Sequence, residues 1–295
     1  MPRVIAFIVA ALLSAFPATA AEITHAGQSR SFTVAGPGAA GGAKLPLVLV
    51  LHGGMGHGDG IRRSTGFDRK AAAEGFIAVF PDGTARRNGR FRTWNAGHCC
   101  GYAAETGADD VGFLLALVEQ MKTKHAVDPA RIYVTGISNG GMMAQRLALE
   151  APTVFAAVAP VVSGLNGDER LPRHAVPALI INGVQDQTIP FAGGPLKRDR
   201  GMKENIPFKP ATYQGQYWAK ANACSGMNKQ GPGQLGKPLT ILTWACPPPR
   251  EVVQYLVHDQ GHAWPGARKG ALGDTPSKNL NATDVIWSFF ERHTR

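Results

Sequence analysis

Ser138 lies in the segment Gly136-Ile137-Ser138-Asn139-Gly140, which has the spacing G-x-S-x-G. The residues before this segment are strand-like and those after it are helix-like. In a nucleophile elbow, small neighbours permit the strained strand-to-helix turn that exposes a serine hydroxyl. The pattern predicts that Ser138 is a nucleophile. The competing interpretation is an ordinary tight turn between a strand and a helix.

A serine hydroxyl needs a general base, and that base needs an acid to orient it. In folds with this elbow the acid and then the histidine follow the serine along the chain. Asp186 and His262 fit, because each follows an apolar, strand-like run. The competing residues are His258, Asp82, Asp109 and Asp110. His258 has less loop-like neighbours and the three acids precede the serine, so the sequence favours Ser138, Asp186 and His262.

Acyl transfer through a serine also requires backbone donors for the developing oxyanion. The amide of Asn139, directly after the nucleophile, is one expected donor. The second is expected from the segment His52-Gly53-Gly54-Met55, with Gly54 preferred and Met55 as the alternative. A Gly-Gly pair can also be a plain turn or a weak phosphate loop, but no G-x-x-x-x-G-K-[ST] motif accompanies it.

The elements that must position these residues alternate between strand-like and helix-like runs. The predicted strands are residues 45–51, 76–80, 131–135, 155–162, 178–181 and 251–257. The predicted helices are residues 111–124, with Asp110 as a candidate cap, and residues 139–150, 212–223 and 283–292. This alternation predicts an α/β fold, with a mostly parallel central sheet and helices on both faces. Two long segments, 84–106 and 190–211, lack periodicity and are expected to be functional loops.

Composition and charge limit the class of protein. The 295 residues are 44% hydrophobic and 18% charged, which excludes a disordered or fibrous chain. The formal net charge is +10, but the basic residues are scattered and no basic helix accompanies them. Solubility therefore explains the charge better than an anionic partner does, and we expect no nucleic-acid binding. The sequence contains no zinc-ligand spacing, so we expect no metal and no organic cofactor.

The first twenty residues have the pattern of a secretory signal peptide. Arg3 precedes an apolar run too short to span a bilayer, and Ala18-Thr19-Ala20 fits a cleavage site. We therefore expect residues 1–20 to be removed and residues 21–295 to form one hydrolase domain, secreted or periplasmic and without a membrane anchor. The sequence does not indicate the oligomeric state.

Four cysteines in an exported chain are expected to form disulfides. They are Cys99, Cys100, Cys224 and Cys246. Adjacent cysteines rarely reach two separate partners, which favours a Cys224–Cys246 bond closing a loop of about 23 residues. Cys99 and Cys100 would then bond to each other or stay reduced. The alternative is crossed pairing, which would tether the loop 84–106 to the other two cysteines.

Several motifs in order resemble the poly(3-hydroxybutyrate) depolymerase/LpqC-like esterase family. They are the segments at 51–54, 93–97 with Cys99-Cys100, 109–113, 136–142, 189–191 and 261–266. The resemblance implies an α/β-hydrolase fold and a triad of Ser138, Asp186 and His262. Where the family usually has His-Gly before the acid, this chain has Asn182-Gly183.

The resemblance implies an exported serine carboxylester hydrolase that cleaves hydroxyalkanoate polyester or its oligomers. The alternative within the family is a feruloyl or acetyl xylan esterase acting on polysaccharide esters, and a different class of alternative is a non-catalytic exported binding protein. Trp94 and Trp264 are candidates for the walls of the substrate cleft, with core packing as the alternative. A single hydrolase domain predicts faster turnover of soluble oligomers than of crystalline granules.

Overall fold

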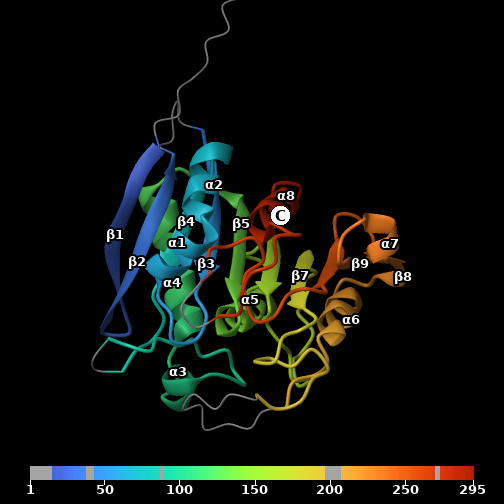
Figure 1. Cartoon of the computed structure of the whole chain (residues 1–295). Coiled ribbons are helices and arrows are strands. Elements are labelled where there is room, and N and C mark those ends of the chain that lie inside the picture. The colour runs from blue at the N-terminus through green and yellow to red at the C-terminus, as the bar shows by residue number, and fades with distance from the viewer. Residues whose placement is uncertain (1–14, 38–42, 87–88, 197–206, 270–272) are drawn as a thin grey trace, which may run out of the picture.

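One mixed sheet organises the molecule. A computed structural model describes residues 15–37, 43–86, 89–196, 207–269 and 273–295 (Figure 1). The sheet has the order β1-β2-β4-β3-β5-β6-β7-β10-β9-β8. Its strands are β1 (Ala15–His25), β2 (Gln28–Pro37), β3 (Leu45–Leu51), β4 (Ile77–Pro81), β5 (Val127–Ile137), β6 (Ala157–Val161), β7 (Ala178–Gly183), β8 (Ser225–Gln230), β9 (Leu239–Ala245) and β10 (Val252–Val257). The six neighbouring strands β4, β3, β5, β6, β7 and β10 are parallel. The two strands at each end of the sheet, β1 and β2 on one side and β9 and β8 on the other, pair in antiparallel register.

The central strands are continuous apolar runs because helices cover both of their faces. In β3, Leu47, Leu49 and Leu51 enter one hydrophobic core, while Val48 and Val50 enter the other. This division follows from the two-residue period of a strand, which sends successive side chains to opposite faces. The run 45–51 therefore serves two cores at once.

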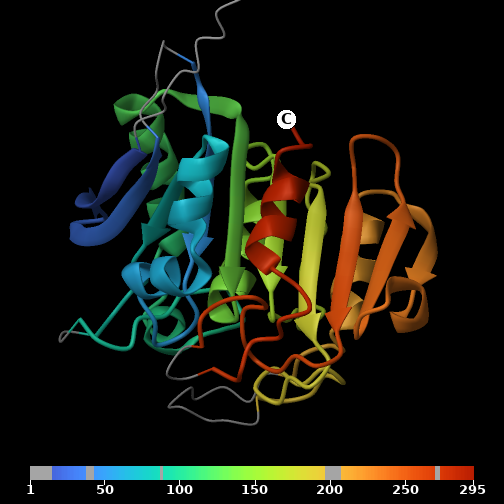
Figure 2. The same cartoon turned by 45° about the horizontal axis from the view of Figure 1, so that its top comes forward.

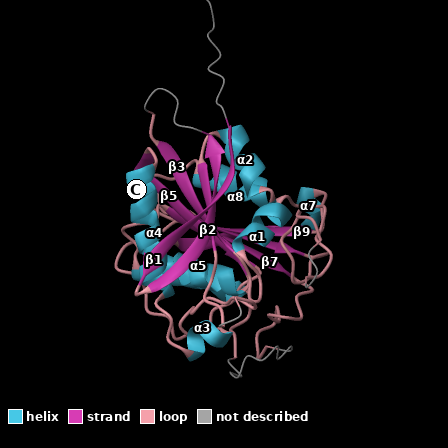
Figure 3. Cartoon of the chain, turned by 90° about the vertical axis from the view of Figure 1, so that its left-hand side faces the viewer, coloured by secondary structure: helices cyan, strands magenta, loops and turns pink. Residues whose placement is uncertain are grey.

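Helices form a layer on each side of the sheet, as Figure 3 shows in side view. The helices are α1 (Gly58–Thr65), α2 (Phe67–Glu74), α3 (Gly101–Glu105), α4 (Asp110–Lys124), α5 (Asn139–Glu150), α6 (Thr212–Ala221), α7 (Pro232–Leu235) and α8 (Ala282–Phe290). Side chains of α4, α5 and α6 belong to one core, and those of α1, α2 and α8 belong to the other. The prediction of a mostly parallel sheet with helices on both faces is confirmed.

The carboxyl ends of the parallel strands meet at one edge of the sheet. Figure 2 shows these strands ending at the loop-rich lower edge of the molecule. Loops that follow β3, β5, β7 and β10 gather there. Since open α/β sheets bind ligands at this edge, residues far apart in the sequence become neighbours here.

The N-terminal hairpin is the largest element that sequence patterning missed. β1 pairs with β2 in antiparallel register from Thr19↔Val34 to His25↔Gln28, so the pairing runs across the expected cleavage point after Ala20. Cleavage after Ala20 would leave the strand pairs between Ala21↔Phe32 and His25↔Gln28. Residues 1–14 of the expected signal peptide lie outside the described residues, and the cleavage stays a prediction.

A disulfide fastens the far end of the sheet. Cys224, just after α6, bonds to Cys246, just after β9, with their Cα atoms 4.0 Å apart. Both half-buried side chains pack against the core beneath α6. The predicted pairing is confirmed, and Cys99 and Cys100 bond to each other. In the described part of the chain no helix is long and apolar enough to cross a membrane.

Candidate active site

Ser138 occupies a strained turn between β5 and α5. Its backbone angles are φ 56° and ψ −126°, a conformation that L-residues adopt only when the surroundings impose it. A Cβ at Gly140 would fall against the carbonyl oxygens of Leu51 and His52, and one at Gly136 would fall against Leu51 and Gly140. The two glycines are therefore required because the elbow is pressed against the end of β3.

The structure brings the three predicted side chains into one hydrogen-bonded chain. His262 Nε2 lies 2.9 Å from Ser138 Oγ, and His262 Nδ1 lies 2.7 Å from Asp186 Oδ2. Asp186 is 3% exposed, and its Oδ1 accepts hydrogen bonds from the backbone N–H groups of Thr188 and Ile189. The second carboxylate oxygen is thereby directed at the imidazole. This arrangement can remove the serine proton and hold the resulting imidazolium.

The competing residues lie elsewhere. His258 Nε2 pairs with Thr240 Oγ1 on β9, 2.9 Å away. Asp82 accepts hydrogen bonds from the Ser31 hydroxyl and the Gly58 N–H. None of these contacts reaches Ser138 or His262.

Asp274 forms two hydrogen bonds with the backbone of His262, the candidate general base. Its Oδ2 accepts a hydrogen bond from the His262 N–H at 2.6 Å, and its own N–H donates to the His262 carbonyl at 3.3 Å. The two hydrogen bonds hold the peptide groups on either side of His262 in place. Sequence analysis missed Asp274, because it lies twelve residues later in an irregular loop with no motif around it.

The oxyanion donors expected from the sequence are placed beside the nucleophile. Gly54 and Asn139 both line the cavity that contains Ser138. Asn139 is the first residue of α5, where a backbone N–H has no partner within the helix. The amide of Met55 donates to the Arg92 carbonyl at 2.7 Å, which leaves Gly54 as the better second donor.

His52 orients the peptide group that carries the Gly54 amide. His52 Nε2 accepts a hydrogen bond from the Gly83 N–H at 2.9 Å, so Nδ1 bears the proton and donates to the Gly53 carbonyl at 2.7 Å. Burial lowers the pKa of His52 to about 4, more than the hydrogen bond to Gly53 raises it. The ring is therefore neutral near pH 7. The Gly53 carbonyl and the Gly54 N–H belong to one planar peptide unit. The hydrogen bond from His52 to the Gly53 oxygen therefore also fixes the direction of the Gly54 N–H.

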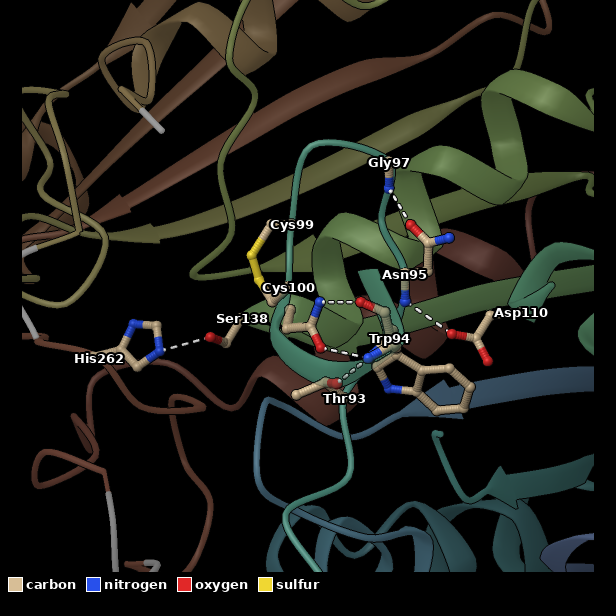
Figure 4. Close-up of a disulfide and its surroundings, with 11 residues drawn as sticks. Thr93, Trp94, Asn95, Gly97, Cys99, Cys100, Asp110, Ser138 and His262 are labelled. Carbon is tan, nitrogen blue, oxygen red and sulfur yellow. Dashed lines mark hydrogen bonds between the residues drawn. A yellow bond between two sulfur atoms is a disulfide. The ribbon is translucent and has the colours of Figure 1, made fainter. Parts of the chain in front are cut away.

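The side chain of Asn139 is locked to the loop that follows β4. Its Oδ1 accepts from the Trp94 N–H at 2.7 Å, and its Nδ2 donates to the Trp94 carbonyl at 2.9 Å. The same carbonyl accepts the Cys100 N–H at 3.1 Å. Figure 4 shows Ser138 and His262 beside this loop and the Cys99–Cys100 disulfide. The loop thus braces the first turn of the nucleophile helix.

The prediction that Trp94 and Trp264 line the substrate cleft is wrong. Trp94 is fully buried, and its indole N–H donates to the His52 carbonyl at 2.9 Å. Trp264 is 3% exposed, packs edge-on against Phe67 and donates to Thr283. Both indoles satisfy their N–H inside the protein, so they support the site from behind and do not contact its cavity.

Asp110 is a buried anchor, and the expectation that it caps α4 is corrected. The N-cap is Asp109, whose Oδ1 accepts from the Gly112 N–H. Asp110 is fully buried and pairs with Arg30 at 2.8 Å, while its other oxygen accepts the Asn95 N–H at 2.7 Å. The carboxylate therefore links the N-terminal hairpin to the loop that braces Asn139.

A cavity of about 460 Å³ opens above the serine. The described walls are mainly apolar and include the side chains of Met55, Phe91, Tyr102, Ile137, Met142 and Ile189. Such a cavity suits a small, largely apolar group. Among the described residues no group of three or more His, Cys, Asp or Glu side chains is placed to hold a metal ion.

Comparison with known proteins agrees with this geometry. Residues 30–183 match the family model described as "Esterase PHB depolymerase". NocK from Nocardia uniformis subsp. tsuyamanensis, which carries an esterase name, is 31% identical over 288 residues, covering 92% of this chain and 82% of that protein. Feruloyl esterase B from Piromyces equi is 32% identical over 203 residues, covering 65% of this chain. The match spans only 35% of that relative's length.

A solved structure shares the fold. An acetyl xylan esterase from Aspergillus awamori superposes with a TM-score of 0.61 at 14% identity, covering 93% of this chain and 99% of that one. At this identity the similarity concerns the fold alone. Together with the sheet order and the elbow, it confirms the predicted α/β-hydrolase fold.

Proposed function

The chain belongs to the PHB depolymerase family of esterases, and we propose that it is a serine carboxylester hydrolase acting on hydroxyalkanoate oligoesters. The single observation that carries the mechanism is the hydrogen-bonded chain Ser138–His262–Asp186 at 2.9 and 2.7 Å. The support for the substrate is the mainly apolar cavity over Ser138. An aliphatic polyester presents methyl and methylene groups on both sides of each ester.

In the proposed reaction, Ser138 Oγ attacks the ester carbonyl carbon while His262 Nε2 takes the hydroxyl proton. The amides of Asn139 and Gly54 stabilise the tetrahedral oxyanion. His262 then protonates the leaving alkoxide, and an acyl-enzyme remains. Water releases the acid by the same route, which regenerates the serine hydroxyl. Asp186 keeps the imidazole in the tautomer that can accept a proton and stabilises its cationic form.

A feruloyl ester is the second candidate substrate. Phe91 and Tyr102 both line the cavity, and the Phe91 side chain is 61% exposed. Aromatic walls favour an aromatic acyl group through stacking and edge-to-face contacts. The relative from Piromyces equi is named a feruloyl esterase, which adds weight to this alternative.

Parallel assays test both the mechanism and the substrate. Hydrolysis of hydroxybutyrate trimer, methyl ferulate, acetylated xylan and polymer granules is compared under identical conditions. We expect the highest kcat/KM on the soluble trimer, because a 460 Å³ cavity accepts a short segment and not a crystalline surface. A higher kcat/KM on methyl ferulate would replace the proposed substrate with the second candidate.

Ser138→Ala serves as the control for the mechanism. It should reduce hydrolysis by several powers of ten, since triad residues act as a unit, and leave the fold intact. Labelling of the wild-type protein by a serine-directed phosphonate distinguishes an enzyme from a non-catalytic binding protein. Near-normal activity of the variant would refute the proposed role of Ser138.

We also propose that the protein is exported and cleaved after Ala20. The support is the signal-peptide pattern of residues 1–20. N-terminal sequencing of the protein recovered from culture medium and periplasm tests this, with Ala21 as the expected first residue. An intact Met1 in both fractions would contradict it.

A further inference from the structure

Arg86 places a permanent positive charge in the wall of the mainly apolar cavity. It follows β4 and lines the same cavity as Ser138. Its side chain is 60% exposed. Among the described lining residues, no aspartate or glutamate faces it from within the cavity. A guanidinium at this position is unexpected for a site that accepts only neutral esters.

Within the described part of the chain, the contacts of the Arg86 side chain leave most of its hydrogen-bonding capacity unused. Its guanidinium carbon lies 5.5 Å from the centre of the Tyr102 ring, which fits a cation–π contact. Its Nη2 lies 3.4 Å from Glu105 Oε2, which is long for a hydrogen bond between charged groups. A guanidinium has five N–H donors in a planar fork that matches both oxygens of a carboxylate. Among the described residues, Tyr102 and Glu105 therefore leave donors of the guanidinium available for another carboxylate.

Building on the proposed function, we propose that Arg86 binds the free carboxylate at the acid end of the oligoester. An oligomer of a hydroxy acid has one such carboxylate, whereas the interior of a polymer chain has none. Ser138 attacks an ester carbonyl, and the ester oxygen leaves with the acid-end fragment after taking a proton from His262. The carboxylate itself is not altered. Arg86 is therefore a specificity-determining residue that selects chain ends, and the released product is a short hydroxy acid.

Glu105 opposes this selection. Its carboxylate competes with the substrate carboxylate for the same guanidinium, at 3.4 Å. Removing that competitor should strengthen binding of the anionic substrate, and removing Arg86 should abolish the preference. Opposite effects from two residues that contact each other are difficult to obtain from general disturbance of the fold.

The experiment compares hydroxybutyrate trimer as the free acid with the same trimer as its methyl ester. Both are assayed by kcat/KM with the wild-type protein, Arg86→Gln and Glu105→Gln. We expect the wild type to prefer the free acid, and Arg86→Gln to lower kcat/KM on the free acid by about 3- to 10-fold. The methyl ester should change by less than about twofold, since it has no charge for the guanidinium to bind. Glu105→Gln should increase the preference for the acid, and added salt should reduce it in the wild type.

Equal effects of Arg86→Gln on the acid and the methyl ester would overturn the role of Arg86 while leaving the proposed esterase function in place. Rapid hydrolysis of both trimers with no preference in the wild type would do the same. Failure of the wild type to hydrolyse either trimer, with methyl ferulate cleaved, would overturn the proposed substrate and this inference together.

Discussion

Replacing Asp186 with asparagine should reverse the tautomer of His262. Asp186 Oδ1 accepts two backbone N–H groups, from Thr188 at 2.8 Å and Ile189 at 3.0 Å. In Asp186→Asn the amide oxygen must keep that position, because an amide NH₂ cannot accept those donors. The NH₂ group then faces His262 Nδ1, where the carboxylate Oδ2 lay at 2.7 Å. Nδ1 becomes the acceptor, and the ring proton moves to Nε2.

With that proton, Nε2 points an N–H at the oxygen of Ser138 and cannot take its proton. The expected loss in kcat is roughly 10⁴-fold, or about 5 kcal/mol of transition-state stabilisation. KM for a small soluble ester should change little, since Asp186 does not line the cavity among the described residues. Stopped or continuous assays at pH 7.5 measure kcat and KM, and thermal unfolding checks that the variant is folded. The two backbone hydrogen bonds should keep Tm close to that of the wild type.

Asp82→Asn is the matched control. Asp82 also follows a strand of the sheet and also accepts a backbone N–H, from Gly58 at 2.8 Å, but it does not contact His262. Its substitution should leave kcat within a few-fold of the wild type. A kcat for Asp186→Asn within tenfold of the wild type would refute the argument that the two backbone donors fix the amide orientation.

Three further predictions concern the buried His52 and the two disulfides. His52 has a folded-state pKa of about 4 because it is buried. Between pH 6.5 and 4 the unfolded chain therefore binds a proton that the folded chain does not, and the free energy of unfolding should fall by about 3 kcal/mol as the pH falls. Urea unfolding at pH 7.5 and 4.5 should show a smaller loss for His52→Gln than for the wild type, and equal losses would contradict this. The double variant Cys99→Ala/Cys100→Ala should lower kcat, since Cys100 lines the cavity and the Cys99–Cys100 bond constrains the turn whose Cys100 N–H donates to the Trp94 carbonyl that Asn139 also contacts. Cys224→Ala/Cys246→Ala should lower Tm and leave kcat unchanged, so a reversed pattern in the two assays would contradict the assignment.

Much of the fold and of the candidate site follows from local patterns in the sequence. The apolar run at 45–51 predicts a strand buried on both faces, which the structure has as β3. The helix at 139–150 begins and ends where the pattern places it. The G-x-S-x-G spacing and the chain order of Ser138, Asp186 and His262 identify the residues that meet. These features depend on the period of a strand or helix and on the steric demands of one turn, which short segments express on their own.

Only the tertiary structure decided whether a given side chain points into the core or toward the site. Trp94 and Trp264 occur in motifs near the site, yet both indoles point into the core. The sequence predicts that Asp110 caps α4, but in the structure it is the first residue of that helix and pairs with the buried Arg30 of the N-terminal hairpin. In each case the outcome depends on a residue distant in the sequence, which no local pattern contains.

The hydrogen bonds that support the site also depend on residues distant in the sequence. His52 fixes the Gly53 peptide only because Gly83 occupies its other nitrogen, and Asp274 clamps His262 from a loop without a motif. The sequence by itself determined which residues carry the chemistry and in which order the strands deliver them. The tertiary structure decided how those residues are oriented and which neighbours hold them. The physical reason is that nucleophile, base and acid are specified by side-chain type and local turn, whereas their orientation depends on hydrogen bonds between segments that come together only in the folded chain.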